Sequence, residues 1–428
     1  MKVIGITAPS TDSGKTTVTL AILSKLSNST SVKIGPDYID GGISSKLTGN
    51  RTWNMDRWIQ GRNYANILPS LADNFDYAVV EGVMGMYDSG SQIDLSTNFY
   101  FEKLKIPYIL VVDISKLAES AYHMARGFLR KSNIGVILNK YSSDKHLEMV
   151  SREFKKHGVR IIGAIPNDKE YSIPQRHLGL YTSLEIENLR TMAEKISRNI
   201  DFSFIEEAGT IKPRNVKRKS SSHVLRRNDV KIAVAFDKAF NFYYSDSLFR
   251  LEEIGKVQYF SPIKGEPPED SDFVYLGGGY PELYADELSR NYKVSEFLKN
   301  HSESGKPILA ECGGLMYLEK EMATDKGNLK MVGVFDGVVN KNSKLTLGYT
   351  KLRSKRPSIL FGKGELVYGH EFHYSTISDD SEKVLTNILG KGISGEDGIQ
   401  VHNTLGTYSH FSLSRYFKRL SRIIIDNK

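Results

Sequence analysis

Short apolar segments alternate with amphipathic segments from the start of the chain. The segments "KVIGI", "YAVV", "YILVV", "GVIL" and "RIIGAI" are brief, rich in β-branched residues and bounded by turn residues, which is typical of buried parallel strands. Amphipathic stretches at 16–27, 117–131 and 145–157 lie between them and predict helices. The pattern starts again with "KIAVAF", "VQYF", "FVYLGGG" and "PILAEC". The sequence therefore predicts the α/β class, with two doubly wound domains.

A basic segment separates the two halves. The chain carries 58 Lys and Arg against 50 Asp and Glu, and much of the net charge of +8 lies in residues 212–231, where Asp229 is the only acidic residue. The segment contains "SSS", lacks apolar periodicity and has no interleaved aromatic residues, so we interpret it as an exposed linker rather than a nucleic-acid-binding arm. We expect an N-terminal domain at 1–205, a basic linker at 206–229 and a C-terminal domain at 230–428.

The composition excludes several classes of protein. A hydrophobic content of 40% and a charged content of 25% are typical of a soluble globular protein. No segment reaches the ~18 apolar residues of a membrane helix, and the first residues do not form a signal peptide. The single cysteine, Cys312, excludes an internal disulfide framework and a CxxC metal site. We therefore expect a cytoplasmic protein without a nucleic-acid or membrane partner, and the sequence leaves open whether it forms a homodimer.

The segment "TAPSTDSGKTT" follows the first predicted strand and opens a predicted helix. In a phosphate-binding loop, backbone N–H groups hold phosphate oxygens, the lysine reaches the outer phosphates, and the Ser or Thr hydroxyl binds Mg²⁺. The loop is one residue longer than the standard pattern and resembles that of dethiobiotin synthetase. We assign ATP binding to the loop residues Ser13, Gly14, Lys15, Thr16 and Thr17.

A Mg²⁺ ion bound with the phosphates needs oxygen ligands. The candidates are Asp37 in "KIGPDYIDGG" and Glu81 in "YAVVEGVMGMYD", where Glu81 ends a strand at the sheet edge that binds ligands in open α/β sheets. We expect Thr16, Asp37 and Glu81 to hold the metal. Asn139, which ends the strand "GVILNK", is a candidate reader of the nucleotide base.

The second half contains a candidate nucleophile. The segment "PILAECGG" predicts a strand that ends at Cys312, and the glycines after it permit the tight turn of a nucleophile elbow. The strand "FVYL" ends in three glycines whose N–H groups could stabilise an oxyanion. His410 in "GTYSHFS" is the candidate base. His370 and His373 in "YGHEFHYS" compete with it for this role. Their H-x-x-H spacing also suggests a metal site, but two ligands without a third make a poor site, so we assign both residues to the substrate side or to structure.

Six motifs in order resemble the family of cobyrinic acid a,c-diamide synthases over nearly the whole chain, namely "KIGPDYIDGG", "EGVMGMYD", "RHLGL", "GGGYPEL", "AECGGLMYL" and "GHEFHYS". The resemblance implies an N-terminal P-loop NTPase-like domain similar to dethiobiotin synthetase and a C-terminal domain similar to class I glutamine amidotransferases. Such enzymes of cobalamin biosynthesis use ATP and Mg²⁺ to activate the a- and c-side-chain carboxylates of cobyrinate, and capture them with ammonia from L-glutamine.

The resemblance also implies roles for individual residues. Cys312 would attack glutamine with His410 as its base, and backbone N–H groups around Gly279 and of Gly313 would form the oxyanion hole. Tyr38 and Asp88 would lie near the acceptor carboxylate. We group Tyr38 with the binding residues and expect Asp88 to take part in the chemistry.

Two positions depart from the pattern. Amidotransferases of the wider class carry a glutamate two residues after the histidine, where this chain has Ser412, so the orienting partner of His410 is not identified. Asp12 stands in the phosphate loop where the family usually has glycine.

Three alternatives stay open. The same motifs and chemistry fit an enzyme that amidates Ni-sirohydrochlorin, and cobyric acid synthase fits "RHLGL" and "GHEFHYS" less well. A nucleotide-switched binding protein of the partition-ATPase kind explains the first half of the chain but leaves Cys312 and His410 without a role. A glutaminase assay separates this last class from the ligases.

Overall fold

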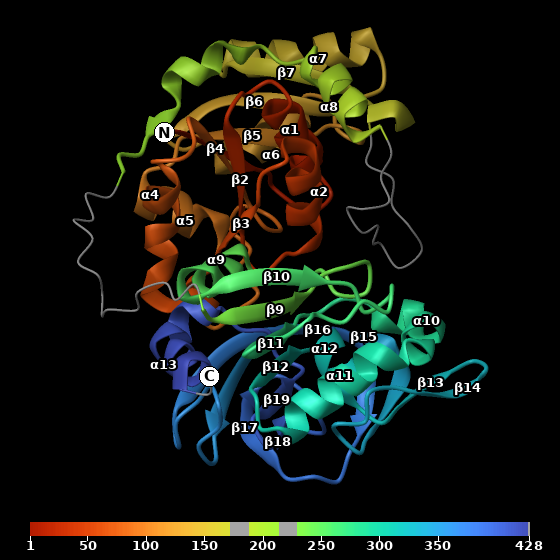
Figure 1. The fold of residues 1–428 in the computed structure, drawn as a ribbon. Helices are drawn as coiled ribbons and strands as arrows, with labels where there is room; N and C mark the ends of the chain where they lie inside the picture. The colour runs from red at the N-terminus through yellow and green to blue at the C-terminus, as the bar shows by residue number, and fades with distance from the viewer. Residues whose placement is uncertain (172–187, 214–228, 427–428) are drawn as a thin grey trace. The chain divides into compact units, whose positions relative to one another are not determined.

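The computed structural model describes residues 1–171, 188–213 and 229–426. The chain divides into two compact units (Figure 1). Unit 1 comprises Met1–Arg57 and Arg62–Val216, and unit 2 comprises Trp58–Gly61 and Lys217–Lys428. The motif "RHLGL" and most of the expected basic linker lie outside the described residues.

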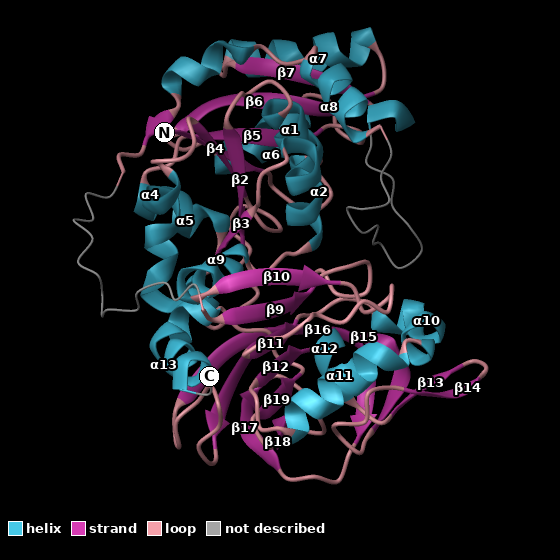
Figure 2. Ribbon diagram, in the orientation of Figure 1, coloured by secondary structure: helices cyan, strands magenta, loops and turns pink. Residues whose placement is uncertain are grey.

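Unit 1 is built on one sheet with the strand order β3-β2-β4-β1-β5-β6-β7, in which all these neighbours are parallel (Figure 2). A short strand, β8, pairs antiparallel with β1. The strands are β1 (Lys2–Thr7), β2 (Ser29–Ile34), β3 (Trp53–Met55), β4 (Tyr77–Glu81), β5 (Tyr108–Asp113), β6 (Asn133–Tyr141), β7 (Ile161–Pro166) and β8 (Gly209–Thr210). The helices are α1 (Lys15–Leu23), α2 (Ile39–Thr48), α4 (Ile67–Leu71), α5 (Thr97–Leu104), α6 (Ser120–Ala125), α7 (Asp144–Lys156) and α8 (Leu189–Ser197), and α3 (Arg57–Gln60) lies where the first range of unit 1 ends.

Successive residues of the strands in unit 1 pack in two different apolar cores, one on each face of the sheet. In β4, Val79 packs in the core formed with α1, α2 and α8, whereas its neighbours Ala78 and Val80 pack in the core formed with α4, α5, α6 and α7. Side chains alternate between the two faces of a sheet, so a strand covered on both faces is apolar throughout. The doubly wound arrangement expected for the first half is confirmed.

Unit 2 combines a parallel and an antiparallel region in one sheet, with the order β10-β9-β11-β12-β19-β18-β17-β15-β13-β14 and with β16 on β15. The parallel strands are β9 (Lys231–Ala235), β10 (Lys256–Phe260), β11 (Phe273–Leu276), β12 (Ile308–Glu311) and β19 (Thr404–Thr407). The other strands are β13 (Glu321–Thr324), β14 (Gly327–Lys330), β15 (Val338–Ser354), β16 (Leu366–Ser378), β17 (Lys383–Leu389) and β18 (Glu396–Val401).

Helices cover both faces of the parallel region of unit 2. The core on one face contains α10 (Ala285–Arg290), α11 (Tyr292–Glu303) and α12 (Gly313–Leu318), and the core on the other contains α9 (Ser245–Ile254) and α13 (Leu413–Asp426). The parallel region agrees with the sequence-based expectation, which did not include the antiparallel region. None of the helices in the described parts of the chain combines the length and apolarity that crossing a bilayer requires.

Candidate functional site

The phosphate-loop sequence joins β1 to α1 in unit 1, and its backbone leaves no room for most side chains. Gly14 caps α1 with φ 94°, and a Cβ atom there would lie 2.1 Å from Nδ2 of Asn139. Asn139 donates from this Nδ2 to the Ser13 carbonyl oxygen at 2.8 Å, so this predicted base reader holds the loop. Asp12 has φ 58°, a left-handed conformation that glycine adopts freely and that aspartate tolerates better than most residues. This explains why the departure from glycine at position 12 is compatible with the loop.

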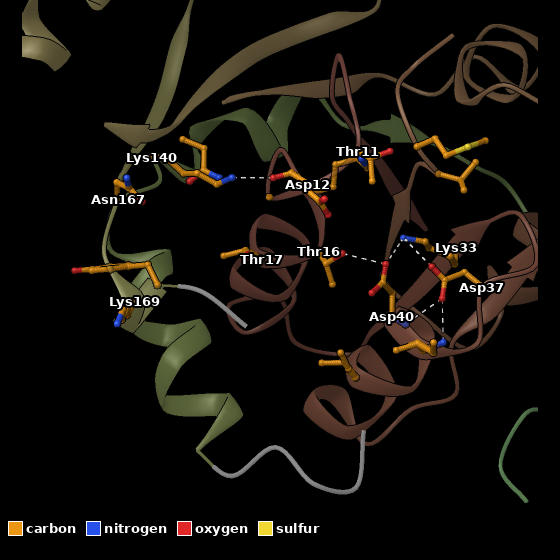
Figure 3. A pocket seen from close by; sticks show the side chains of 18 of the residues that line it. Thr11, Asp12, Thr16, Thr17, Lys33, Asp37, Asp40, Lys140, Asn167 and Lys169 are labelled. Atoms are coloured by element: carbon orange, nitrogen blue, oxygen red, sulfur yellow. Dashed lines mark hydrogen bonds and ion pairs between the residues drawn. The ribbon is translucent and has the colours of Figure 1, made fainter. Parts of the chain in front are cut away.

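A pocket of about 880 Å³ opens at the N-terminus of α1 (Figure 3). Of the predicted site residues, the pocket is lined by Gly14, Lys15, Thr16, Thr17, Asp37 and Asn139. Lys140, Asn167 and Lys169 also line it, and the sequence analysis did not identify them. Ser13, Tyr38, Glu81 and Asp88 are not among the lining residues. Asp88 is exposed, and its Oδ2 accepts a hydrogen bond from the Gly85 N–H at 2.9 Å.

A buried lysine lies among the carboxylates of the pocket. Nζ of Lys33, on β2, is 2.7 Å from Oδ2 of Asp40 (Figure 3). The same Nζ is 2.6 Å from Oε1 of Glu81. The Thr16 hydroxyl donates to the same two oxygens, at 2.7 Å for Glu81 and 3.1 Å for Asp40. Asp37 is more distant, at 3.6 Å from Nζ, and its Oδ1 accepts the N–H groups of Ile39 and Asp40 at the start of α2.

The charges of this cluster stabilise one another. Burial alone would lower the pKa of Lys33, but the Asp40 and Glu81 carboxylates outweigh it and raise the pKa well above its usual value. Burial would likewise raise the pKa of Asp40, yet the Lys33 ammonium holds it below its usual value. Burial and the Asp40 carboxylate raise the pKa of Asp37 to about 7. Burial and the Lys33 charge lower the pKa of Lys15 to about 8.

The donor set fits Mg²⁺ held together with phosphate oxygens. Among the described residues, no group of three or more His, Cys, Asp and Glu side chains could hold a metal ion by itself. However, the oxygens of Thr16, Asp40 and Glu81 already surround one cation, the Lys33 ammonium. Mg²⁺ is usually held by one or two carboxylates plus substrate phosphates, and this arrangement offers two carboxylates next to the phosphate-loop sequence. Asp40 was missed from sequence, although it lies in the motif that supplied Asp37.

The second site lies where three neighbouring parallel strands of unit 2 end. The glycine run begins after β11, Cys312 follows β12, and the segment that carries His410 follows β19. Cys312 has φ 48° and ψ −99°, a strained conformation for a residue with a side chain. Its N–H donates to the Thr407 carbonyl oxygen at 2.6 Å, and α12 begins at Gly313. This strand–turn–helix geometry is that of a nucleophile elbow.

The glycines of the second site allow backbone segments to approach closely. A Cβ atom on Gly278 would lie 2.3 Å from Cε1 of His410, and one on Gly279 would lie 2.0 Å from the Ala239 carbonyl oxygen. A Cβ atom on Gly313 would lie 3.0 Å from the backbone nitrogen of Gly279. The two N–H groups assigned to an oxyanion hole, those of Gly279 and Gly313, therefore belong to adjacent segments.

The Cys312 thiol is buried and protonated in this arrangement. It is 1% exposed, and its Sγ donates to the Phe372 carbonyl oxygen at 3.3 Å. Burial, with a smaller contribution from the Glu282 carboxylate, raises the pKa of the thiol far above its usual value. Glu282 itself has a pKa raised to about 7 by burial. A thiolate at this position requires a base that takes the proton as the sulfur reacts.

The three histidines singled out from sequence gather around this site on two segments. His410 and His370 exchange backbone hydrogen bonds, and their rings stack with centroids 5.0 Å apart. Nδ1 of His370 pairs with the Tyr244 hydroxyl at 2.8 Å, and burial lowers the pKa of His370 well below its usual value. His373 stacks on Tyr408 with centroids 3.9 Å apart. Their burial and stacking favour the structural alternative for His370 and His373 over a role on the substrate side.

Comparison with known proteins identifies relatives of both halves of the chain. A family model described as the CobQ/CobB/MinD/ParA nucleotide binding domain matches residues 4–180, and one described as the CobB/CobQ-like glutamine amidotransferase domain matches residues 231–416. The cobyrinate a,c-diamide synthase of Sulfolobus acidocaldarius is 38% identical, over 97% of this chain and 98% of the relative. The proteins of the same name from Sulfurisphaera tokodaii and Saccharolobus solfataricus are each 36% identical, over 96% and 98% of this chain and 97% and 100% of the relatives.

Replacing Lys33 with methionine should destabilise unit 1 by about 3 kcal/mol, because it leaves the buried Glu81 and the partly buried Asp40 without a counter-charge. Thermal unfolding measures the effect. Mg²⁺ should raise the melting temperature of Lys33→Met more than that of the unsubstituted protein, since a divalent cation replaces the lost ammonium. Lys25→Met, at an exposed lysine close after α1, is the matched control and should change stability by less than about 0.5 kcal/mol. Equal melting temperatures for Lys33→Met and Lys25→Met would contradict the assignment of Lys33 as the counter-charge of Glu81 and Asp40.

Proposed function

The chain belongs to the family of cobyrinate a,c-diamide synthases, which are glutamine-hydrolysing amide ligases of cobalamin biosynthesis, and we propose that it amidates the a- and c-side-chain carboxylates of cobyrinate. The observation that carries the proposal is the occurrence, in one chain, of a phosphate loop beside a carboxylate cluster and of a buried cysteine on a strained elbow. A nucleotide-switched binding protein would use the first of these sites alone.

The first reaction activates a carboxylate. A carboxylate is a poor acceptor for ammonia, because its leaving group would be oxide. Transfer of the γ-phosphoryl group of ATP to the carboxylate forms an acyl phosphate and ADP, and the leaving group then becomes phosphate. The transfer joins two anions, so it depends on positive charge and on fixed geometry for in-line attack.

The residues of the pocket are suited to this transfer. The ammonium of Lys15, with its pKa lowered to about 8, remains largely charged near neutral pH and can bind the outer phosphates. Thr16, Asp40 and Glu81 would hold Mg²⁺, with Asp37 at the edge of the cluster. The ion, when bound, supplies further charge neutralisation on the transferring phosphoryl group.

The second reaction liberates ammonia. Cys312 attacks the side-chain amide carbon of glutamine while His410 takes the thiol proton, and the carbonyl oxygen becomes an oxyanion that the N–H groups of Gly279 and Gly313 stabilise. Collapse of this intermediate expels ammonia, which takes the proton from His410, and leaves a thioester. Water then hydrolyses the thioester to glutamate and restores the thiol.

Mass spectrometry of the products tests the substrate. The protein is incubated with ATP, Mg²⁺, glutamine and either cobyrinate or Ni-sirohydrochlorin. We expect the mass of cobyrinate to fall by about 2 Da after two amidations, because each exchange of a hydroxyl for an amino group removes about 1 Da. Conversion of Ni-sirohydrochlorin with cobyrinate left unchanged would replace the proposed substrate by the alternative macrocycle.

Cys312→Ala should lower glutamine-dependent amidation by ~10³-fold or more and leave amidation with added ammonium salt intact. The physical reason is that the thiol only liberates ammonia, whereas the carboxylate is activated in unit 1. Product formation from each nitrogen source measures the two activities. Loss of both activities in a folded Cys312→Ala protein would contradict this division of labour.

The reciprocal variants are Lys15→Ala and Thr16→Ala. Each should remove ATP hydrolysis and both amidation activities and retain at least part of the glutaminase activity, because the two sites lie in different units. Normal ATP turnover in Lys15→Ala would exclude the phosphate-loop assignment.

Glu81→Gln and Asp88→Asn should differ in severity. Glu81→Gln removes a charge that contacts both Thr16 and Lys33. The substitution should lower the rate of phosphoryl transfer by roughly 10²-fold or more. In Asp88→Asn, the amide oxygen can still accept from the Gly85 N–H, so the loop keeps its shape and the enzyme loses only the charge that would position ammonia. This variant should be slower, and could accumulate the monoamide.

Positional isotope exchange measures the first step of these variants. With cobyrinate present and ammonia absent, reversible phosphoryl transfer moves ¹⁸O between the β,γ-bridge and non-bridge positions of ATP. Exchange at the rate of the unsubstituted enzyme in Glu81→Gln would remove Glu81 from the metal site. Normal diamide formation in Asp88→Asn would remove Asp88 from the chemistry.

A further inference from the structure

Ser412 stands where related amidotransferases carry the glutamate that orients the catalytic histidine, and its side chain is engaged elsewhere. The Ser412 hydroxyl donates to Oδ2 of Asp246, in α9, at 2.5 Å. Both residues are buried. A serine hydroxyl that is committed to this carboxylate does not supply a negative charge to the imidazole of His410.

Glu311 is a buried acidic residue in an otherwise apolar strand. The three residues before it in β12, Ile308, Leu309 and Ala310, are buried and apolar, and Glu311 itself is 1% exposed. Glutamate is almost never fully buried without partners, because an uncompensated charge is strongly destabilising in the interior. The position of Glu311 therefore has to be explained by what its carboxylate contacts.

The Glu311 carboxylate accepts a hydrogen bond from the backbone of the His410 segment and lies close to the His410 ring. Oε1 accepts a hydrogen bond from the Phe411 N–H at 3.1 Å. Oε2 lies 3.6 Å from Nδ1 of His410 and accepts a hydrogen bond from the Tyr275 hydroxyl at 2.9 Å. The distance to Nδ1 is that of an ion pair, and such contacts in catalytic groups are often loose before substrate binds.

We propose that Glu311 is the positioning residue of His410 and takes the place of the missing glutamate two positions after the histidine. The inference rests on the proposed roles of Cys312 and His410. Its carboxylate fixes Nδ1, so that Nε2 is left to accept the thiol proton, and its charge stabilises the imidazolium that forms when the proton is transferred. The residue directly before the nucleophile thus orients the base.

The groups that face His410 do not neutralise the charge of the Glu311 carboxylate. The ring of His370, on β16, stacks on the His410 ring. The backbone of Gly278 lies against the His410 ring at Cε1, and the Glu311 carboxylate approaches Nδ1 from β12. The pKa of His370 lies well below its usual value, so this neighbour is neutral near neutral pH and does not cancel the charge of Glu311. The Tyr275 hydroxyl is also neutral, since burial raises the pKa of Tyr275 well above its usual value.

Two variants of Glu311 separate charge from size. Glu311→Gln keeps the size and loses the charge, and Glu311→Asp keeps the charge on a shorter side chain. We expect Glu311→Gln to lower kcat for glutamine hydrolysis by ~10²-fold or more with a change in KM below about threefold, and Glu311→Asp to retain more activity. The acid limb of kcat/KM against pH should move to lower pH in Glu311→Gln, because the protonated imidazole loses its anionic neighbour. A Gln variant as active as the Asp variant, or with an unmoved acid limb, would overturn the proposal.

Two further variants control for a structural role. Glu319→Gln alters another buried carboxyl group of unit 2, which accepts the Gly337 N–H at 2.9 Å and whose pKa is raised by burial to about 8. It controls for the loss of a buried carboxyl group without loss of a charge, and should change kcat by less than about threefold. Tyr275→Phe removes a hydrogen bond to the Glu311 carboxylate but keeps the charge. The acid limb of kcat/KM in this variant should therefore lie at the same pH as in the unsubstituted enzyme or at a higher pH. A loss in Glu319→Gln equal to that in Glu311→Gln, or a shift of Tyr275→Phe to lower pH, would leave Glu311 only a structural role. Thermal unfolding reports folding in every variant, because amidation with added ammonium salt depends on unit 1 alone.

The Cys312→Ala variant distinguishes a failure of this inference from a failure of the proposed function. If Cys312→Ala still hydrolyses glutamine, Cys312 is not the nucleophile. If Cys312→Ala abolishes hydrolysis while Glu311→Gln matches the unsubstituted enzyme, the nucleophile stands and only the positioning role fails.

Discussion

The need to compensate a carboxylate buried at the end of a parallel strand shapes both sites. Glu81 ends β4 and Glu311 ends β12, and each is 1% exposed. Glu81 is compensated by the Lys33 ammonium from the neighbouring strand and by the Thr16 hydroxyl. Glu311 is compensated by hydrogen bonds from the Tyr275 hydroxyl and the Phe411 N–H. In each unit, one hydrogen-bond donor to the buried carboxylate belongs to a segment with a proposed role, namely Thr16 at the start of α1 and the Phe411 N–H next to His410.

This constraint explains why local features of the sites could be predicted and their partners could not. The phosphate loop and the elbow at Cys312 are encoded by glycines next to the functional residue, and the neighbouring sequence was enough to identify both. Lys33 was missed because its importance comes from its contact with Glu81 on the neighbouring strand, and Asp40 was missed because its partners Thr16 and Lys33 lie in other elements. A signal existed for Lys33, since every residue of β2 is buried and a lysine in such a strand requires a partner. Glu311 offered the same signal, being an acidic residue at the end of a buried apolar strand.

The fold shows the same division between local and distant information. Parallel strands covered on both faces are continuous apolar runs, which is why β1, β4, β5, β11 and β12 could be recognised. In β16 of unit 2, buried residues alternate for most of the strand with partly or fully exposed ones, and the strand contains many polar side chains. Such strands are stabilised by their pairing, and β15 pairs with both β16 and β17. The sequence of one strand does not reveal that pairing.

The protonated thiol indicates how the second site avoids premature reaction. A free thiolate at Cys312 would be a buried, uncompensated negative charge near the carboxylates of Glu282 and Glu311, which burial and repulsion both disfavour. The thiol proton is instead shared with the Phe372 carbonyl oxygen. Negative charge on sulfur becomes favourable only as it passes to the carbonyl oxygen of a bound amide, where two backbone N–H groups can accept it. In the proposed mechanism, proton transfer to His410 and attack on glutamine therefore belong to one step. The Glu311 carboxylate near Nδ1 would lower the energy of that step, because it would stabilise the imidazolium while the charge is separated.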